Sequence, residues 1–130
     1  MALRYLLDTD VIIWHLRGHE PTEAILRAIE GEQPLGCSAL SVFEVWSGVR
    51  SREEDPTRRF LETLHQVPAD GPIAEAAAEY WRHFRHRGVT LGRADALIAA
   101  TARVRDLVLV TYIRDHYPMG DVALYDPMPH

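Results

Sequence analysis

The chain contains no lysine, no asparagine and only one cysteine, Cys37, among its 130 residues. A single cysteine excludes an internal disulfide framework and fits a reducing cytoplasm. Because lysine is absent, all 14 basic residues are arginine, whose planar guanidinium suits bidentate contacts with phosphate or carboxylate groups.

Long apolar runs are also missing. The longest is far too short to span a membrane, and the N-terminus lacks a signal-peptide pattern, so we expect a cytoplasmic protein. The net charge of −5 argues against a general polyanion-binding surface but allows a local basic patch. The length and the hydrophobic content of 47% predict a single globular domain over residues 1–130.

Apolar runs of strand type alternate with helical patterns along the chain. Strands are expected at residues 5–7, 34–37, 107–111 and 122–125. Helices are expected at residues 11–16, 23–30, 38–50, 56–66, 73–87 and 94–104. This alternation predicts an α/β fold, a three-layer α/β/α sandwich with a central, mostly parallel sheet.

Two acids follow expected strands. Asp8 ends the apolar run of residues 5–7, and ligands gather at the carboxyl ends of parallel strands. The alternative is that Asp8 or Thr9 only caps the following helix. Asp115 comes a few residues after the strand at 107–111, which would bring it to the same sheet edge, unless it is an exposed loop acid.

Two further acids lie on expected helices. Glu44 lies opposite an apolar helix face, among small residues that would let a substrate or a metal approach. Alternatively, Ser41 and Glu44 form a capping box. Asp95 heads an apolar stripe and would point toward the sheet from the start of its helix, or it is a simple N-cap. The stripe consists of Ile98, Ala99 and Ala102.

Converging carboxylates repel one another, so a cluster of them favours a hard cation such as Mg²⁺ or Mn²⁺. A zinc site is the first alternative, because two histidine-containing sets fall at helical spacings, but neither offers a full ligand set. These sets are His15 with His19, and Glu79 with His83 and His86. A phospho-acceptor Asp8 of receiver type would need a lysine near a later strand end, and the chain has none.

Four segments, in order, carry a family resemblance: YLLDTDVIIW, SALSVFEVWSGVR, ADALIAATA, and LVLVT followed by a loop ending in HYPM. They resemble PIN-domain ribonucleases, specifically the VapC-type toxins of bacterial toxin–antitoxin pairs. The resemblance implies a metal-dependent endoribonuclease site at the carboxyl edge of the sheet. It places the metal-binding acids at Asp8, Glu44 and Asp95.

The chain departs from the family pattern at two positions. Ile113 stands where the family commonly has an Asn or Asp after the fourth strand, so Asp115 is expected to supply the fourth ligand through a shifted loop. The first motif usually reads D-T-N, whereas Asp10 stands here in place of the Asn. Asp10 would then either add a charge to the site or be solvated.

The expected reaction is hydrolysis of an RNA phosphodiester by a metal-activated water, with Mg²⁺ or Mn²⁺ as cofactor. The resemblance also implies a homodimer and a small antitoxin whose C-terminal segment occludes the site, in a heterotetramer or larger assembly. The alternative is a PIN-like RNA- or protein-binding module that lost catalysis at Ile113. Arginines expected to contact phosphate, unless simply solvated, are Arg50, Arg52, Arg82, Arg85, Arg87 and Arg93, of which Arg93 could instead pair with Asp95.

Overall fold

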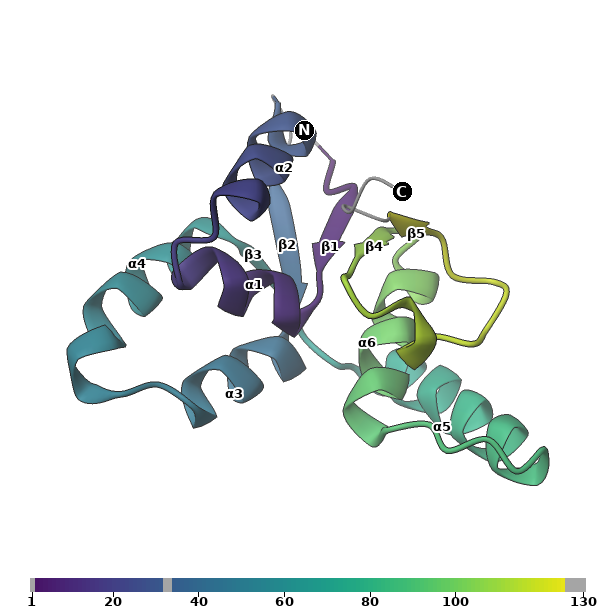
Figure 1. The fold of residues 1–130 in the computed structure, drawn as a ribbon. Helices are drawn as coiled ribbons and strands as arrows, with labels where there is room; N and C mark the ends of the chain where they lie inside the picture. The colour runs from purple at the N-terminus through teal and green to yellow at the C-terminus, as the bar shows by residue number, and fades with distance from the viewer. Residues whose placement is uncertain (1, 32–33, 126–130) are drawn as a thin grey trace.

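Five short strands form one sheet in the computed structural model, which describes residues 2–31 and 34–125 (Figure 1). The strands are β1 (Tyr5–Leu7), β2 (Leu35–Ser38), β3 (His65–Val67), β4 (Val108–Val110) and β5 (Leu124–Tyr125). Their order is β3-β2-β1-β4-β5, and every neighbouring pair runs parallel. The predicted α/β class is confirmed.

Six α-helices lie on the two sides of this sheet, with α1 to α4 on one side and α5 and α6 on the other (Figure 1). The helices are α1 (Thr9–Leu16), α2 (Glu20–Glu30), α3 (Ala39–Ser47), α4 (Glu54–Thr63), α5 (Gly71–His86) and α6 (Arg93–Val104). Short 3₁₀ turns, η1 (Ser51–Glu53) and η2 (Arg114–His116), lie in the connections. Within the described residues, no helix has both the length and the apolar content needed to cross a bilayer.

Successive side chains of β1 enter two separate cores, because side chains alternate between the faces of a strand. Leu6 is fully buried among residues of α5 and α6, whereas Leu7 is fully buried among residues of α1 to α4. In β4, Leu109 and Val110 divide in the same way. The three-layer sandwich thus follows from apolar strands that are covered on both faces.

The structure corrects the sequence analysis at several boundaries. Helix α4 ends at Thr63, so the prediction of a helix through residue 66 was wrong, and strand β3 follows instead. Two of the three β3 side chains are exposed at the sheet edge, which leaves little apolar pattern to detect. Helix α1 begins at Thr9, two residues earlier than predicted, because the Asp8 side chain accepts the Thr9 amide and caps it.

Strand β1 lies at the centre of the sheet, between β2 and β4. Because all strands are parallel, the carboxyl ends of these three strands meet at one edge. The residues that leave them there are Asp8 after β1, Ala39 after β2 and Thr111 after β4. Helix α6 also begins near this edge, on the other layer (Figure 1).

Candidate active site

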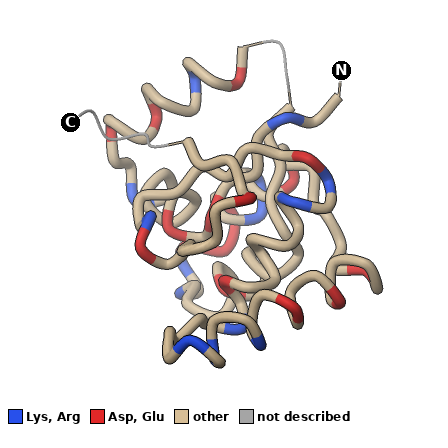
Figure 2. Tube along the Cα trace, turned by 90° about the vertical axis from the view of Figure 1, so that its right-hand side faces the viewer, with Lys and Arg blue, Asp and Glu red and all other residues tan. Residues whose placement is uncertain are grey.

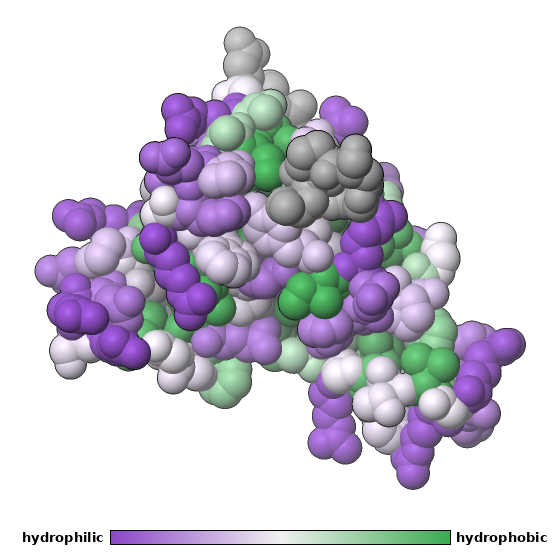
Figure 3. Space-filling model, viewed as in Figure 1, coloured by the Kyte–Doolittle hydropathy of each residue, from purple (hydrophilic) through white to green (hydrophobic). Residues whose placement is uncertain are grey.

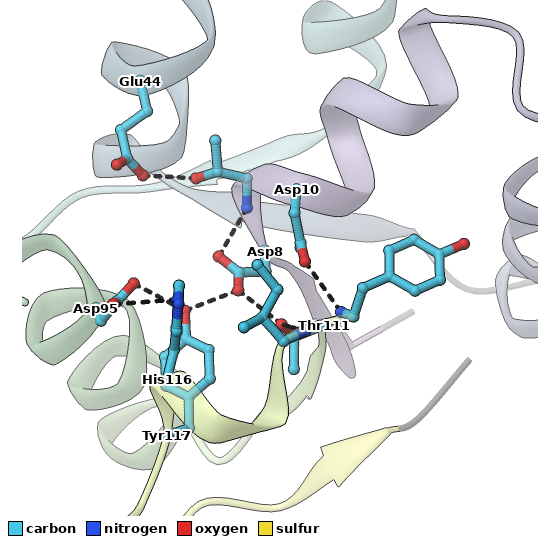
Figure 4. A network of polar contacts seen from close by, with 10 residues as sticks. Asp8, Asp10, Glu44, Asp95, Thr111, His116 and Tyr117 are labelled. Atoms are coloured by element: carbon cyan, nitrogen blue, oxygen red, sulfur yellow. Dashed lines mark hydrogen bonds and ion pairs between the residues drawn. The ribbon is translucent and has the colours of Figure 1, made fainter. Parts of the chain in front are cut away.

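Asp8 is the most enclosed acid of the site, with only 5% of its surface exposed. Its Oδ1 accepts the Thr9 amide at 2.8 Å, and its Oδ2 accepts the hydroxyls of Thr111 and Tyr117, each at 2.8 Å (Figure 4). Burying a carboxylate is costly unless it is hydrogen-bonded. Three donors meet that cost and fix the orientation of the carboxylate, so Asp8 is both the cap of α1 and the centre of the site.

The Tyr117 hydroxyl lies between two carboxylates. It donates to Asp8, and its oxygen is 3.5 Å from Oδ1 of Asp95. Tyr117 is 4% exposed, and burial, followed by the charge of Asp8 and the hydrogen bond to it, raises the pKa of the phenol far above its usual range. The hydroxyl therefore keeps its proton, and its role here is that of a donor.

Asp95 lies in the first turn of α6, half-buried, above the buried stripe that the sequence predicted. Burial raises its pKa, the charge of His116 opposes this, and the charges of Asp8 and Glu44 raise it further. His116 Nδ1 is 3.4 Å from Oδ2 of Asp95, a contact that is an ion pair when the imidazole is protonated (Figure 4). The N-cap of α6 is Gly92, so the interpretation of Asp95 as an N-cap was wrong.

Glu44 faces Asp8 from α3, across Thr9. The Thr9 hydroxyl donates to Oε1 of Glu44 at 2.7 Å and lies 2.9 Å from the hydroxyl of Ser41, which is fully buried. The alternative of a Ser41–Glu44 capping box was wrong, because α3 is capped by Ser38 through the Leu40 amide. The Glu44 carboxylate is thus oriented by a residue of α1.

Asp10 holds the loop after β4. Its Oδ1 accepts the Val11 amide at 2.8 Å, and its Oδ2 accepts the Tyr112 amide at 3.1 Å. Burial, with a smaller contribution from the charge of Asp8, raises its pKa to about 6. Of the two alternatives for Asp10, the solvated one was therefore wrong, since both carboxylate oxygens accept backbone amides.

The two remaining candidates lie at the rim. Asp115 is exposed on η2, and none of its described contacts joins it to Asp8, Glu44 or Asp95. Ile113 is 40% exposed, and its amide donates to the Thr111 hydroxyl at 3.1 Å. The side chains that η2 and its following residue direct into the site are instead those of His116 and Tyr117. A fourth ligand at Asp115 stays a prediction.

The donor set suits a hard divalent cation, because Asp8, Glu44 and Asp95 offer only oxygen. The three acids are also joined by shared partners, because the Tyr117 hydroxyl contacts Asp8 and Asp95, and Thr9 contacts Asp8 through its amide and Glu44 through its hydroxyl. In the part of the chain that the structure describes, however, no three His, Cys, Asp or Glu side chains are arranged to hold one ion directly.

Sequence reasoning did not identify Tyr117 and His116 as site residues. Each is more than a hundred residues from Asp8 in sequence, and no local pattern links them to it. The available signal was the segment HYPM, which was noticed as part of the family resemblance without a role for its side chains.

Comparisons with known proteins agree with this geometry. Residues 5–119 match the PIN domain. Ribonuclease VapC10 of Mycobacterium tuberculosis is 38% identical over 114 residues, which cover 88% of this chain and 86% of that protein. The crystal structure of FitAcB from Neisseria gonorrhoeae is similar at a TM-score of 0.80 and 28% identity, with 95% of this chain and 97% of that chain covered.

A third similarity concerns the fold alone. The crystal structure of VapBC2 from Rickettsia felis, bound to a promoter DNA fragment, gives a TM-score of 0.86 at 18% identity and covers 96% of this chain and 98% of that chain. A family match over most of the chain and a relative at 38% identity are decisive. This chain belongs to the PIN-domain family and, within it, to the VapC type.

Proposed function

We propose that the protein is a Mg²⁺- or Mn²⁺-dependent endoribonuclease and the toxin of a toxin–antitoxin pair. The observation that carries this proposal is the convergence of Asp8, Glu44 and Asp95 at the carboxyl edge of the sheet, where Tyr117 contacts Asp8 and Asp95 and Thr9 contacts Asp8 and Glu44. The similarity to proteins named ribonuclease supports RNA as the substrate.

The residues of the chain divide into ligands and positioning residues. Asp8, Glu44 and Asp95 would hold the cation, directly or through water, and Asp115 would assist. When bound, the cation would supply Lewis acidity and lower the pKa of a water molecule that attacks the phosphodiester.

Around these acids, hydroxyl groups fix the geometry before substrate arrives. Thr111 and Tyr117 hold Asp8 in one orientation, and Thr9 holds Glu44. Burial beside Asp8 raises the pKa of the Tyr117 phenol, so its hydroxyl acts as a hydrogen-bond donor to Asp8. Preorganised groups of this kind lower the reorganisation that accompanies charge development in the transition state.

The proposed antitoxin would approach the site along the helical layer of α1, α3 and α4. A cavity of about 570 Å³ lies between these helices, with Ile13, Leu16 and Val45 among its apolar lining and Glu44 at its border. An extended or helical C-terminal segment would fill such a groove and occlude the acids. The similarity to a toxin–antitoxin complex from Klebsiella pneumoniae supports an antitoxin as the partner. We expect a homodimer that forms a heterotetramer or larger assembly with the antitoxin.

A second candidate function is an RNA- or protein-binding module without catalysis. It is favoured by Ile113, which supplies no ligand where the family commonly has one, and by the exposed position of Asp115. This candidate predicts RNA or protein binding that is independent of metal, and no cleavage.

The deciding experiment is RNA cleavage by the purified protein freed of antitoxin, with Mg²⁺ or Mn²⁺ and with chelator. We expect Asp8→Asn or chelator to lower the rate by about 100-fold or more, because several kcal/mol of transition-state stabilisation depend on the site. Asp55→Asn is the control, since Asp55 is exposed in the first turn of α4. No cleavage of tRNA, rRNA or mRNA by a folded, metal-binding protein would favour the binding module.

A further inference from the structure

Two arginines share one aromatic ring beside the acid site. The guanidinium of Arg85, on α5, lies 4.9 Å from the ring centroid of Trp81, and that of Arg93, which opens α6, lies 5.6 Å from the same centroid. Helices α5 and α6 pack extensively on each other, so residues eight positions apart in the sequence become neighbours in space. We call Trp81, Arg85 and Arg93 the arginine–tryptophan cluster.

The position of Arg93 is not explained by helix stability. The N-terminus of a helix carries a partial positive charge, which favours acids and disfavours cations. Arg93 is the first residue of α6, where it gains no favourable dipole interaction. Arg85, in contrast, lies in the last turn of α5, where a cation is favoured. The helix dipole therefore accounts for Arg85 but not for Arg93.

The arginines of this corner are not paired with carboxylates in the part of the chain that the structure describes. In residues 2–31 and 34–125, no ion pair with a carboxylate involves Arg85, Arg93 or the two nearby arginines Arg82 and Arg87. Figure 2 shows arginine positions gathered at the lowest part of the molecule, which Figure 1 identifies as the α5–α6 corner. In a chain of net charge −5, this corner is a local concentration of positive charge.

Stacking on Trp81 also prepares the guanidiniums for a ligand. A guanidinium that lies over an aromatic ring keeps its N–H donors free at its edges and loses rotational freedom in advance. Hydrophilic side chains project from this corner into solvent in Figure 3, at its lower right. The cluster therefore offers phosphate oxygens a positive charge, oriented N–H donors and access from solvent.

Arg93 and Asp95 both lie in the first turn of α6, so the cluster is close to the acid site along the chain, with the two side chains on different sides of the helix. No ion pair joins Arg93 to Asp95 in the described residues, and Asp95 is instead contacted by His116. We propose that Trp81 aligns Arg85 and Arg93 to bind the phosphates of single-stranded RNA that enters the acid site. The inference rests on the proposed function, because it takes RNA as the substrate.

The test is equilibrium binding of a fluorescein-labelled single-stranded RNA of mixed sequence, measured by anisotropy over a series of salt concentrations. The protein carries Asp8→Asn to prevent cleavage, with a chelator-treated wild-type sample as the second background. We expect Arg85→Gln and Arg93→Gln each to raise Kd by about 3- to 10-fold and to reduce the salt slope by about 0.7, the value for one phosphate contact on a single strand.

Two further variants separate alignment from charge. Trp81→Leu keeps both cations but removes their support, so it should raise Kd while leaving the salt slope unchanged. Arg58→Gln is the matched control, because Arg58 stacks on Trp46 at 4.8 Å on the opposite helical layer. It should change neither the affinity nor the slope.

The outcomes distinguish this inference from the proposed function. If Arg85→Gln and Arg93→Gln leave the salt slope unchanged while the wild type cleaves RNA, the cluster does not bind RNA phosphates. The proposed nuclease function would be unaffected by that result. An equal effect of Arg58→Gln would also overturn it, since the loss would then be one of net charge. Wild-type protein that neither binds nor cleaves RNA would overturn both.

Discussion

Removing the Tyr117 hydroxyl should destabilise the protein through Asp8. Both side chains are at most 5% exposed, so water cannot replace the donor when Tyr117→Phe removes it. Asp8 would keep two of its three donors, the Thr9 amide and the Thr111 hydroxyl. A hydrogen bond to a charged group contributes about 1.5–3 kcal/mol. We expect the free energy of unfolding to fall by this amount.

The measurement is urea denaturation at neutral pH with chelator present, and the control is Tyr80→Phe. Tyr80 is equally buried and donates to Asp121 at 2.6 Å, but the Asp121 side chain is 55% exposed and can take up water instead. Loss of the Tyr80 hydroxyl should therefore lower the free energy of unfolding by only about 0.5–1 kcal/mol.

A double-mutant cycle with Asp8→Asn assigns the effect to the pair. With a neutral side chain at position 8, the loss on Tyr117→Phe should fall to that of a neutral hydrogen bond, about 0.5–1.5 kcal/mol. A coupling energy within about 0.5 kcal/mol of zero, the range seen for independent sites, would refute the reasoning. So would a cost for Tyr117→Phe no larger than that for Tyr80→Phe.

Two other predictions concern Asp10 and Gly92. The pKa of Asp10 is raised from 3.8 to about 6 in the folded state, so folding is favoured when this carboxyl is protonated. The free energy of unfolding should therefore fall by about 1–2 kcal/mol between pH 4 and pH 7. Asp10→Asn should flatten this decline in urea titrations, and an unaltered decline would contradict the prediction. A Cβ at position 92 would lie 3.1 Å from Oδ2 of Asp95, so Gly92→Ala should displace the Asp95 carboxylate slightly and slow RNA cleavage by about 3- to 10-fold. Gly48→Ala is the control and should not slow cleavage, because a Cβ at position 48 meets nothing within 4 Å.

The parts of the site that follow from local pattern were accessible from the sequence. An apolar run that stops at Asp8 predicts a strand end, and the spacing from Asp95 to Ile98 and Ala102 predicts a buried helix face. Both inferences use only neighbours in the chain. The sandwich itself follows because strands and helices alternate, and parallel strands require crossovers.

The rest depended on contacts that no local pattern encodes. Strand β3 has a single buried side chain, Val67, and forms because the edge of β2 offers free hydrogen-bonding groups. Asp10 could not be assigned, because its partner is the amide of Tyr112, more than a hundred residues away. The inward positions of His116 and Tyr117 are set by the 3₁₀ turn η2, whose geometry leaves Asp115 outside.

The hydrogen bond between Tyr117 and Asp8 spans 109 residues, and this separation orders events during synthesis. A ribosome that adds about 5–20 residues per second makes Asp8 early and Tyr117 several seconds later. Until then the carboxylate lacks two of its three donors, because β4, which leads to Thr111, and Tyr117 have not yet been synthesised. The nascent chain therefore carries its acids in an unassembled state until β4 and η2 have been synthesised, and the site matures about a hundred residues after Asp8 is made.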